Sequence, residues 1–394
     1  MLLFGYNKLS GMRRKLVMLP GPTNVPDRVT QAMLGQVLNH RSPAFRKVLR
    51  SVSDKTKQVF QTSNDIITLT ASGSGGVEAA IINTIRPGDK VLVTSFGEFG
   101  HRVVEQVVAA GGNPLIVDAN PGDAPSIDQI KEVANKNKDI KSIIAVYNET
   151  STGVTLRNLR EIGKIASDIG AFYIVDAISI LGGDELPVDE LGVDICIAGS
   201  QKCLAAPPGL VSLSISNRVK EFLQKNPPPT RHYFNFPRYF KYAEKGETPF
   251  TPAIPIFYAL DEALTIVLEE GLSNRIKRHK ICADAFYNAF KAIGLNAIAK
   301  EEVRSNVVIA FSYPQGIDDR TFRDTLDERF DIIIAGGMGD LKGKAFRIGC
   351  MGEIRQQSVL LTILSTSMLL NEMGYHNKTE KALEEAIIKL KQLN

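Results

Sequence analysis

The chain has 394 residues, 44% of them apolar, and a formal net charge of +4 at pH 7. This length suffices for two domains with sizeable cores, and without a long basic run the charge argues against nucleic acid as the main partner. Four scattered cysteines without a Cys-x-x-Cys pair argue against a disulfide framework or a zinc site and favour a cytoplasmic location. No apolar run is long enough to span a bilayer, and the N-terminus does not have the pattern of a signal peptide.

Short β-rich runs alternate with helical patterns from about residue 66 to residue 216. The runs are IITLT, KVLVTS, PLIVD, SIIAVYN, FYIVDA, DICIAGS and LVSLSIS. Nearly continuous apolar strands that alternate with helices predict the α/β class, with a mostly parallel seven-stranded sheet flanked by helices. The helical stripe in residues 158–169 precedes Gly170, a typical residue at a helix C-terminus. The Pro-Pro-Gly turn at 207–209 is too short for a crossover, so the last strand is expected to return antiparallel.

The proline-rich stretch NPPPTRHYFNFPRYF interrupts this alternation. Helical patterns then cover 255–270 and 274–293, and the remainder reads as the strand VVIAFS, the helix DRTFRDTLDERF, the strands IIIAGG and FRIGCM, and a helix from Gln356. We therefore expect an N-terminal arm over residues 1–20, a large domain over 21–270 and a smaller α+β domain over 271–394.

Ligands of open α/β sheets bind at the carboxyl ends of the strands, so the residues that follow each strand are the candidates. The first strand is followed by ASGSGGVEAAI, where Ser74, Gly75 and Gly76 would offer backbone N–H groups to a single phosphate at the start of a helix. A plain strand-to-helix turn explains these residues equally well. The segment is neither a Walker loop nor a complete G-x-G-x-x-G motif.

Three further residues follow strands in the same way. Phe99 lies between two glycines, free to stack on a flat ring, and Ser151 offers a hydroxyl. Asp176 ends an apolar strand, where a semi-buried carboxylate requires a cationic or N–H partner such as a protonated pyridine nitrogen. Each also has a structural explanation, as a loop side chain that covers the core, a turn serine and a salt-bridged aspartate.

Lys202 follows the apolar strand DICIAGS. A buried ammonium costs several kcal/mol unless it is paired or neutralised, and formation of an imine neutralises it; a lysine that extends from a turn into solvent is the alternative. Together, a phosphate cup, a ring stacker, a carboxylate and a lysine at one sheet edge are what pyridoxal 5'-phosphate requires. The five histidines are dispersed, so no metal site is expected.

At this point the chain resembles the class V, fold type I aminotransferases, and within them the alanine–glyoxylate and serine–pyruvate branch. The resemblance covers nearly the whole chain from Leu16 onward. It rests on LPGPTNVP, QVLNHRSPAF, SGSGGVEAA, NETSTG, VDAISILGG, GSQKCLAAPPG, TPFTPAIPIFYAL and FRIGCMG, in this order. The fold implied is that of a fold type I pyridoxal phosphate transferase.

The resemblance also implies roles for individual residues. Lys202 would be the Schiff-base lysine, and Asp176 the partner of the pyridine nitrogen. Thr248 and Thr251 would reach the phosphate of the neighbouring subunit's cofactor, so that a homodimer shares its active sites. The other cofactor contacts implied are Ser74, Gly75, Gly76, Phe99, Ser151 and Gln201.

Arg347 in FRIGCMG resembles the arginine that binds the substrate carboxylate, which a guanidinium matches with two parallel hydrogen bonds. A strand arginine in an ion pair is the alternative. Gly21 and His40 match segments that line the substrate pocket in relatives. The implied enzyme transfers the amino group of alanine or serine to glyoxylate or pyruvate by ping-pong chemistry, and the absence of an assigned second arginine favours such small substrates.

Other functions stay open at this stage. An aspartate-type class V aminotransferase would use the same cofactor, as would a cysteine desulfurase with Cys350 or Cys282 as its nucleophile. A nicotinamide-dependent oxidoreductase or a non-catalytic scaffold on the same sheet would be colourless, whereas a pyridoxal phosphate enzyme would be yellow.

Overall fold

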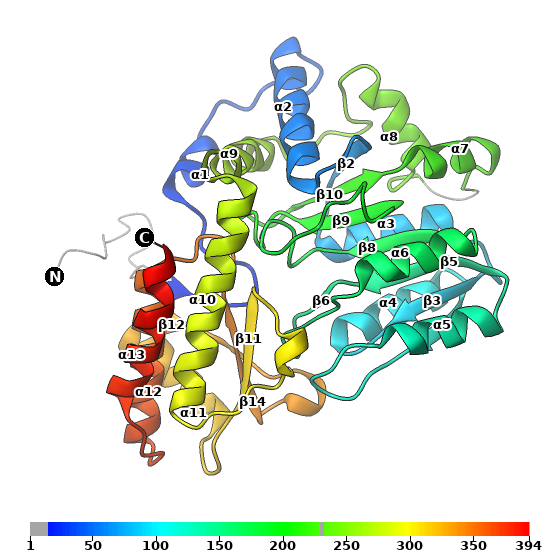
Figure 1. Ribbon diagram of the computed structural model, residues 1–394. Coiled ribbons are helices and arrows are strands. Elements are labelled where there is room, and N and C mark those ends of the chain that lie inside the picture. Colours follow the sequence, from blue (N-terminus) through cyan, green and yellow to red (C-terminus); the bar gives the residue numbers. More distant parts are fainter. Residues whose placement is uncertain (1–14, 229–231, 394) are drawn as a thin grey trace.

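The computed structural model describes residues 15–228 and 232–393 (Figure 1). Its central sheet has seven strands in the order β2-β10-β9-β8-β5-β3-β4. Strand β10 runs antiparallel to both of its neighbours, and the remaining pairs are parallel. The predicted α/β class, the seven strands and the antiparallel return after the Pro-Pro-Gly turn are thereby confirmed. The strands are β2 (Asp65–Thr70), β3 (Lys90–Thr94), β4 (Asn113–Val117), β5 (Ile140–Val146), β8 (Phe172–Asp176), β9 (Ile195–Gly199) and β10 (Leu210–Ile215).

Helices cover this sheet, and several begin at a serine that caps the first turn. Ser72 and Ser216 accept hydrogen bonds from Gly75 and Val219, as N-cap serines commonly do. Helix α6 ends at Asp168, and Gly170 follows with φ of +70°, a left-handed conformation that favours glycine. The helices are α1 (Asp27–Ala32), α2 (Pro43–Phe60), α3 (Gly73–Thr84), α4 (Glu98–Ala109), α5 (Ile127–Lys136), α6 (Leu159–Asp168), α7 (Asn217–Lys225), α8 (Phe236–Ala243) and α9 (Ile254–Glu270), and the short strands β6 (Asn148–Glu149) and β7 (Val154–Thr155) pair with each other.

A second apolar core lies around the sheet β11-β14-β13 and the helices beside it, below and to the left of the large sheet in Figure 1. Helix α10 begins directly after Gly271, beside α9, and extends into this second core. No helix of the described residues is both long and apolar enough to cross a membrane. The elements are α10 (Leu272–Ala292), η1 (Glu301–Val303), β11 (Val308–Ser312), α11 (Asp319–Phe330), β12 (Ile332–Ile333), β13 (Ala335–Gly336), η2 (Gly339–Leu341), β14 (Ala345–Gly349), α12 (Gln356–Glu372), α13 (Thr379–Leu390) and η3 (Lys391–Leu393).

Two details differ from the sequence-based expectation. The segment IIIAGG was expected as one strand, but it divides at Ile334 because β12 pairs with β1 (Leu16–Val17) whereas β13 pairs with β14. Residues 15–20 were expected to belong to a separate arm. Instead, β1 lies in register with Ile332 and Ile333, and Met18 is buried in the second core. The rest of the expected arm, residues 1–14, lies outside the described residues.

Helix α3 approaches the sheet closely at Gly76, and this approach positions the start of the helix. A Cβ atom at residue 76 would lie 2.5 Å from a methyl group of Val211 and 2.9 Å from one of Ile197. Both valine and isoleucine belong to central strands of a closely packed core, so neither side chain has space to move.

We therefore expect Gly76→Ala to lower the free energy of unfolding by about 1–3 kcal/mol, because overpacking outweighs the better helix propensity of alanine. Gly35→Ala is the control, since its nearest neighbours would lie at an ordinary 3.4 Å. Thermal and urea unfolding of the two variants and the wild type measure the difference. A Gly76→Ala protein as stable as the wild type would contradict the close approach.

Candidate active site

Parallel register brings the ends of β5, β8 and β9 to one edge of the sheet. Asp176, the last residue of β8, lies opposite Val146 of β5 and Ile197 of β9. The chain leaves β9 at Gly199 and reaches Lys202 three residues later. A cavity of about 140 Å³ lies at this edge. Its lining residues are Ser72, Gly73, Ser74, Val77, Phe99, Arg102, Val103, Gln106, Asn148, Thr150, Asp176, Ile178, Ser179, Gln201 and Lys202.

Lys202 carries an amine that is largely buried and has no carboxylate partner within the described residues. Its Nζ donates a hydrogen bond to the carbonyl oxygen of Pro20. The pKa of Lys202 is lowered to about 8, chiefly by burial and also by the nearby charge of Arg347, whereas Cys203 and Asp176 act in the opposite direction. At pH 7 about a tenth of the amine is therefore uncharged, which is the form that a nucleophile or proton acceptor requires.

Gly21 leaves the space that the lysine side chain occupies. With φ of +102°, it adopts a conformation that favours glycine, and a Cβ atom there would lie 2.4 Å from Cδ of Lys202. The segment that follows is attached to the same turn, since the amide of Thr23 donates to the carbonyl oxygen of Gln201 at 3.2 Å. Gly21 thus lies beside the amine.

Asp176 is the carboxylate of the cavity. Its Oδ1 accepts a hydrogen bond from the amide of Ile178 at 3.0 Å. Burial raises the pKa of Asp176 to about 6, and the negative charge of Glu149 raises it as well, whereas that backbone hydrogen bond and the charge of Lys202 lower it. A cationic N–H group inside the cavity would favour the charged form of this carboxylate.

The start of α3 offers amide groups to an anion, but they are not all those expected from the sequence. The amide of Gly75 donates to Oγ of Ser72 at 3.3 Å and that of Gly76 to the carbonyl oxygen of Ser72 at 3.2 Å. Gly75 and Gly76 do not line the cavity. Gly73 and Ser74 do, and no described residue accepts a hydrogen bond from the amide of Gly73 or of Ser74. The preference of serine for the N-cap position would have placed the helix start at Ser72 and identified these two amides.

Phe99 lies on the cavity wall as expected, and two residues of the same helix accompany it. Arg102 lies with its guanidinium carbon 4.7 Å from the centre of the Phe99 ring, and Gln106 lines the cavity one turn further. Neither was predicted from the sequence, although spacings of three and four residues place them on one helical face with Phe99.

Gln201 lies in the cavity wall with its side-chain oxygen buried and without a hydrogen-bond partner in the described residues. Ser151 does not line the cavity: its Oγ donates to the carboxylate of Glu149 at 2.6 Å. Asn148 and Thr150, which flank Glu149, do line it. A buried polar atom without a partner in a cavity wall is typical of a site that a polar ligand completes.

Arg347 lies in the middle of β14 and reaches toward the same edge. Its Nε donates to the carbonyl oxygen of Gly336 at 2.8 Å, and Nη1 donates to that of Thr150 at 2.9 Å. The side chain is buried, and within the described residues its hydrogen bonds go to carbonyl oxygens and it forms no ion pair. Burial lowers the pKa of Arg347, whereas the charge of Glu149 raises it. The alternative of an ion-paired surface arginine is therefore wrong, and the guanidinium is available to an anion.

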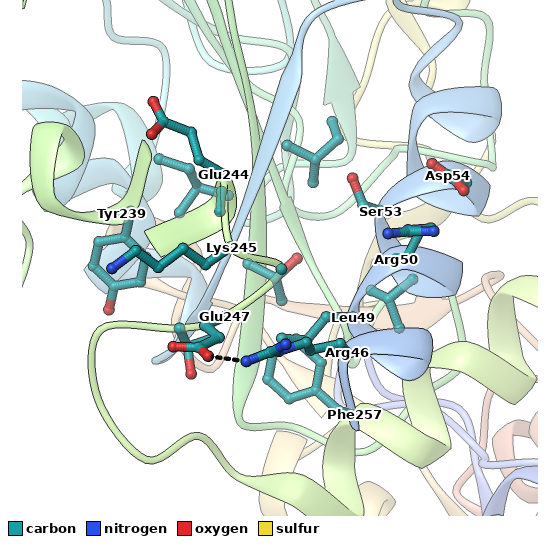
Figure 2. Close-up of a pocket in the computed structure, with 17 residues that line it drawn as sticks. Arg46, Leu49, Arg50, Ser53, Asp54, Tyr239, Glu244, Lys245, Glu247 and Phe257 are labelled. Carbon is teal, nitrogen blue, oxygen red and sulfur yellow. Dashed lines mark hydrogen bonds and ion pairs between the residues drawn. The ribbon is translucent and has the colours of Figure 1, made fainter. Parts of the chain in front are cut away.

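Besides Gly75, Gly76 and Ser151, five residues expected at the site do not line this cavity: Gly21, Arg347, His40, Thr248 and Thr251. Neither His40, between α1 and α2, nor Thr251, which is exposed, contacts it. Thr248 lines a different and larger cavity of about 400 Å³ between α2, β2 and the segment after α8. Figure 2 shows this second cavity, where Arg46 and Glu247 form an ion pair at 2.6 Å. It contains none of the residues at the strand ends, so we assign the chemistry to the smaller cavity.

The cysteines and acidic groups provide no competing centre. Cys282 and Cys350 are fully buried in the second core, and burial raises the pKa of Cys350 well above that of a free thiol. A hydrogen bond with Cys350 lowers the pKa of Cys282, but neither thiol is exposed and neither lines the cavity, which argues against the desulfurase alternative. In the part of the chain that the structure describes, no group of three or more histidine, cysteine or acidic side chains could hold a metal ion.

Comparisons with known proteins find similarity over nearly the whole chain. The family model described as "Aminotransferase class-V" matches residues 18–342. An uncharacterized aminotransferase of Methanocaldococcus jannaschii is 43% identical over 95% of this chain and 97% of its own length. A serine–glyoxylate aminotransferase of Methylorubrum extorquens is 35% identical over 92% of both chains. Among solved structures, the ureidoglycine–glyoxylate aminotransferase of Bacillus subtilis superposes with a TM-score of 0.93 at 32% identity, over 96% of this chain and 99% of that one.

The raised pKa of Asp176 predicts a pH-dependent stability of the ligand-free protein. The pKa of Asp176 is about 6 in the folded state and 3.8 for an ordinary aspartate of an unfolded chain, so the stability from the bound proton is lost as the pH rises between these values. At pH 8 we expect Asp176→Asn to be more stable than the wild type by about 1–3 kcal/mol, because it removes a buried charge.

Urea unfolding of ligand-free protein at pH 8 and pH 4 measures this difference, which should shrink at pH 4. Asp118→Asn is the matched control, since Asp118 also follows a strand but is exposed. If the difference in stability between Asp176→Asn and the wild type were the same at both pH values, burial of the charged carboxylate would not destabilise the fold.

Proposed function

The chain belongs to the class-V aminotransferases, and we propose that it transfers the amino group of a small amino acid, alanine or serine, to glyoxylate or pyruvate. The observation that supports this most directly is the buried amine of Lys202, which shares one cavity with Asp176 and has no carboxylate partner in the described residues. The family match favours this activity over the nicotinamide-dependent oxidoreductase and the non-catalytic scaffold.

Pyridoxal 5'-phosphate is the cofactor that the family implies, and the residues of the cavity suit it. The two amides of Gly73 and Ser74 suit a phosphate, and the carboxylate of Asp176 suits a protonated ring nitrogen. Phe99 offers a flat face for the ring, and the unpaired side-chain amide of Gln201 offers a further polar contact. Of the other contacts that the resemblance implies, Gly75, Gly76 and Ser151 do not line the cavity, and they already donate to Ser72 or Glu149.

When bound, this coenzyme acts as an electron sink for the electron pair of the substrate Cα–H bond. Lys202 accepts the proton from Cα as its uncharged amine and would deliver it to the coenzyme rather than back to Cα, a role for which a pKa near neutrality is suited. Asp176 in its charged form retains the proton on the ring nitrogen. Arg347 binds the substrate carboxylate through its free N–H groups and so orients the Cα–H bond for the transfer.

The named relatives support the choice of substrates. Two of them, the serine–glyoxylate and the ureidoglycine–glyoxylate aminotransferases, carry glyoxylate in their names. Glyoxylate has one carboxylate, and Arg347 is a single buried guanidinium without an acidic partner in the described residues. We therefore propose that a single carboxylate is recognised on both the amino donor and the acceptor.

We further propose a homodimer that shares its active sites, in the cytoplasm. His40, Thr248 and Thr251 match family positions at the site, yet they do not line the cavity of their own chain. A second copy that presents these residues would account for both facts. Leu34 and Val37, close to His40 in sequence, are large apolar residues with 83% and 64% exposure, as expected of a surface that a partner covers.

The central test is replacement of the amine. Lys202→Ala should lower transamination by about 100- to 10,000-fold, because general acid–base catalysis at Cα is lost. Purified wild type should be yellow, and borohydride should bleach it and label Lys202. Lys225→Ala, at an exposed lysine, should change neither property. A panel of amino donors with glyoxylate, pyruvate and 2-oxoglutarate identifies the substrates, and undiminished exchange by Lys202→Ala would refute the mechanism.

A second test concerns Arg347. Arg347→Lys should raise the KM for the amino donor by about tenfold or more with a smaller change in kcat, because an ammonium cannot form two parallel hydrogen bonds to a carboxylate. Arg355→Lys, an exposed arginine paired with Glu353, is the matched control. Unchanged KM values for all donors and acceptors would exclude Arg347 from substrate binding.

A further inference from the structure

Glu149 is a fully buried carboxylate next to the cavity, yet it does not line it. It belongs to β6, three residues after the end of β5, and its exposed fraction is 0%. Burial raises the pKa of its carboxyl group. Within the described residues no lysine, arginine or histidine forms an ion pair with it, and the groups that act on its carboxyl are Ser151, Gly100 and Phe99. A carboxylate in such surroundings persists only if several hydrogen bonds compensate for the lost water.

Four hydrogen bonds provide this compensation, and all come from residues around the cavity. One carboxylate oxygen accepts the amides of Phe99 and Gly100, each at 3.0 Å. The other accepts the amide of Ser151 at 3.0 Å and its hydroxyl at 2.6 Å. The amide donors at 99 and 100 belong to the first turn of α4, where amides have no partner inside the helix.

Glu149 therefore takes the place of a local cap for α4. The N-cap residue is Gly97, which has no side chain with which to cap the helix. A Cβ atom at Gly97 would lie 2.5 Å from Cδ of Glu149 and 2.6 Å from Oγ of Ser151. The missing side chain is thus what allows a carboxylate from a distant strand to reach the helix start.

This arrangement also fixes the hydroxyl of Ser151. Its proton is donated to Glu149, and its oxygen accepts the amide of Glu98 at 3.2 Å. A serine hydroxyl has one proton and two acceptor positions, so it retains a single acceptor position and no free proton. The orientation of both Ser151 and the Phe99 backbone consequently depends on one side chain.

We infer that Glu149 is a positioning residue, which holds Phe99 against the ring of pyridoxal 5'-phosphate and fixes the hydroxyl of Ser151. This inference rests on the proposed function. Removal of the negative charge should leave two amides of α4 poorly satisfied and allow the Phe99 ring to shift. Cofactor binding, rather than the fold, should then show the effect.

The test compares Glu149→Gln with Glu105→Gln, a substitution of the same kind at an exposed glutamate of α4. Full-length proteins are freed of cofactor and titrated with pyridoxal 5'-phosphate. Glu149→Gln should raise the dissociation constant by about ten- to a hundredfold and reduce the visible circular dichroism of the bound cofactor. Glu105→Gln should match the wild type in both measurements.

A double-mutant cycle with Phe99→Ala shows whether Glu149 acts through Phe99. We expect Glu149→Gln to change the dissociation constant less than about threefold in the Phe99→Ala background, since contacting residues are not additive. The inference would be overturned if the two substitutions changed the dissociation constant by independent factors that multiply in the double variant. It would also be overturned if Glu149→Gln bound the cofactor like the wild type. If Glu149→Gln does not fold, Glu149→Asp, which keeps the charge but is shorter, should still bind more weakly than the wild type, and equal binding would overturn the inference.

Failure of the proposed function has a different signature. In that case neither the wild type nor any variant at position 149 would bind pyridoxal 5'-phosphate.

Discussion

The parallel register of β5, β8 and β9 is the constraint on which the site depends. Strands that run in the same direction end at the same edge of the sheet. A polar residue lies at or just after each of these ends, because the buried interior of an apolar strand could not accommodate it. Asp176 and Lys202 are brought together in this way although a long loop and strand β9 separate them in the sequence. The antiparallel β10 allows the chain to turn back directly after the lysine, so the amine is presented by a short and buried turn.

Burial then acts on the two groups in opposite directions. It raises the pKa of Asp176 to about 6 and lowers the pKa of Lys202 to about 8, so each group moves from its usual range toward neutrality. Neither group forms a direct ion pair with the other, which would have stabilised both charged forms. The site thus contains a carboxylate and an amine that a ligand, rather than each other, can pair with. Their burial without such a partner lowers the stability of the ligand-free fold.

Much of this could be predicted from the sequence, because apolar strands and the residues after them are local signals. Lys202, Asp176 and Phe99 meet at one cavity for that reason. The division of IIIAGG at Ile334 depends on pairing with a strand far away in the sequence, which no local pattern records. The position of the phosphate amides depends on which serine caps α3, and Glu149 was missed because a carboxylate inside NETSTG has no apolar neighbours to indicate its burial.

The N-terminal segment has a consequence for the order in which the protein is assembled. Residues 16–17 pair with β12, the neighbouring Pro20 accepts the hydrogen bond of the Lys202 amine, and Gly352 approaches the carbonyl oxygen of Lys202 from the other end of the chain. The surroundings of the amine therefore come from the segment before the large sheet and from the second core. A chain that has folded its large sheet alone still lacks them, so the site is completed only when the second core has formed.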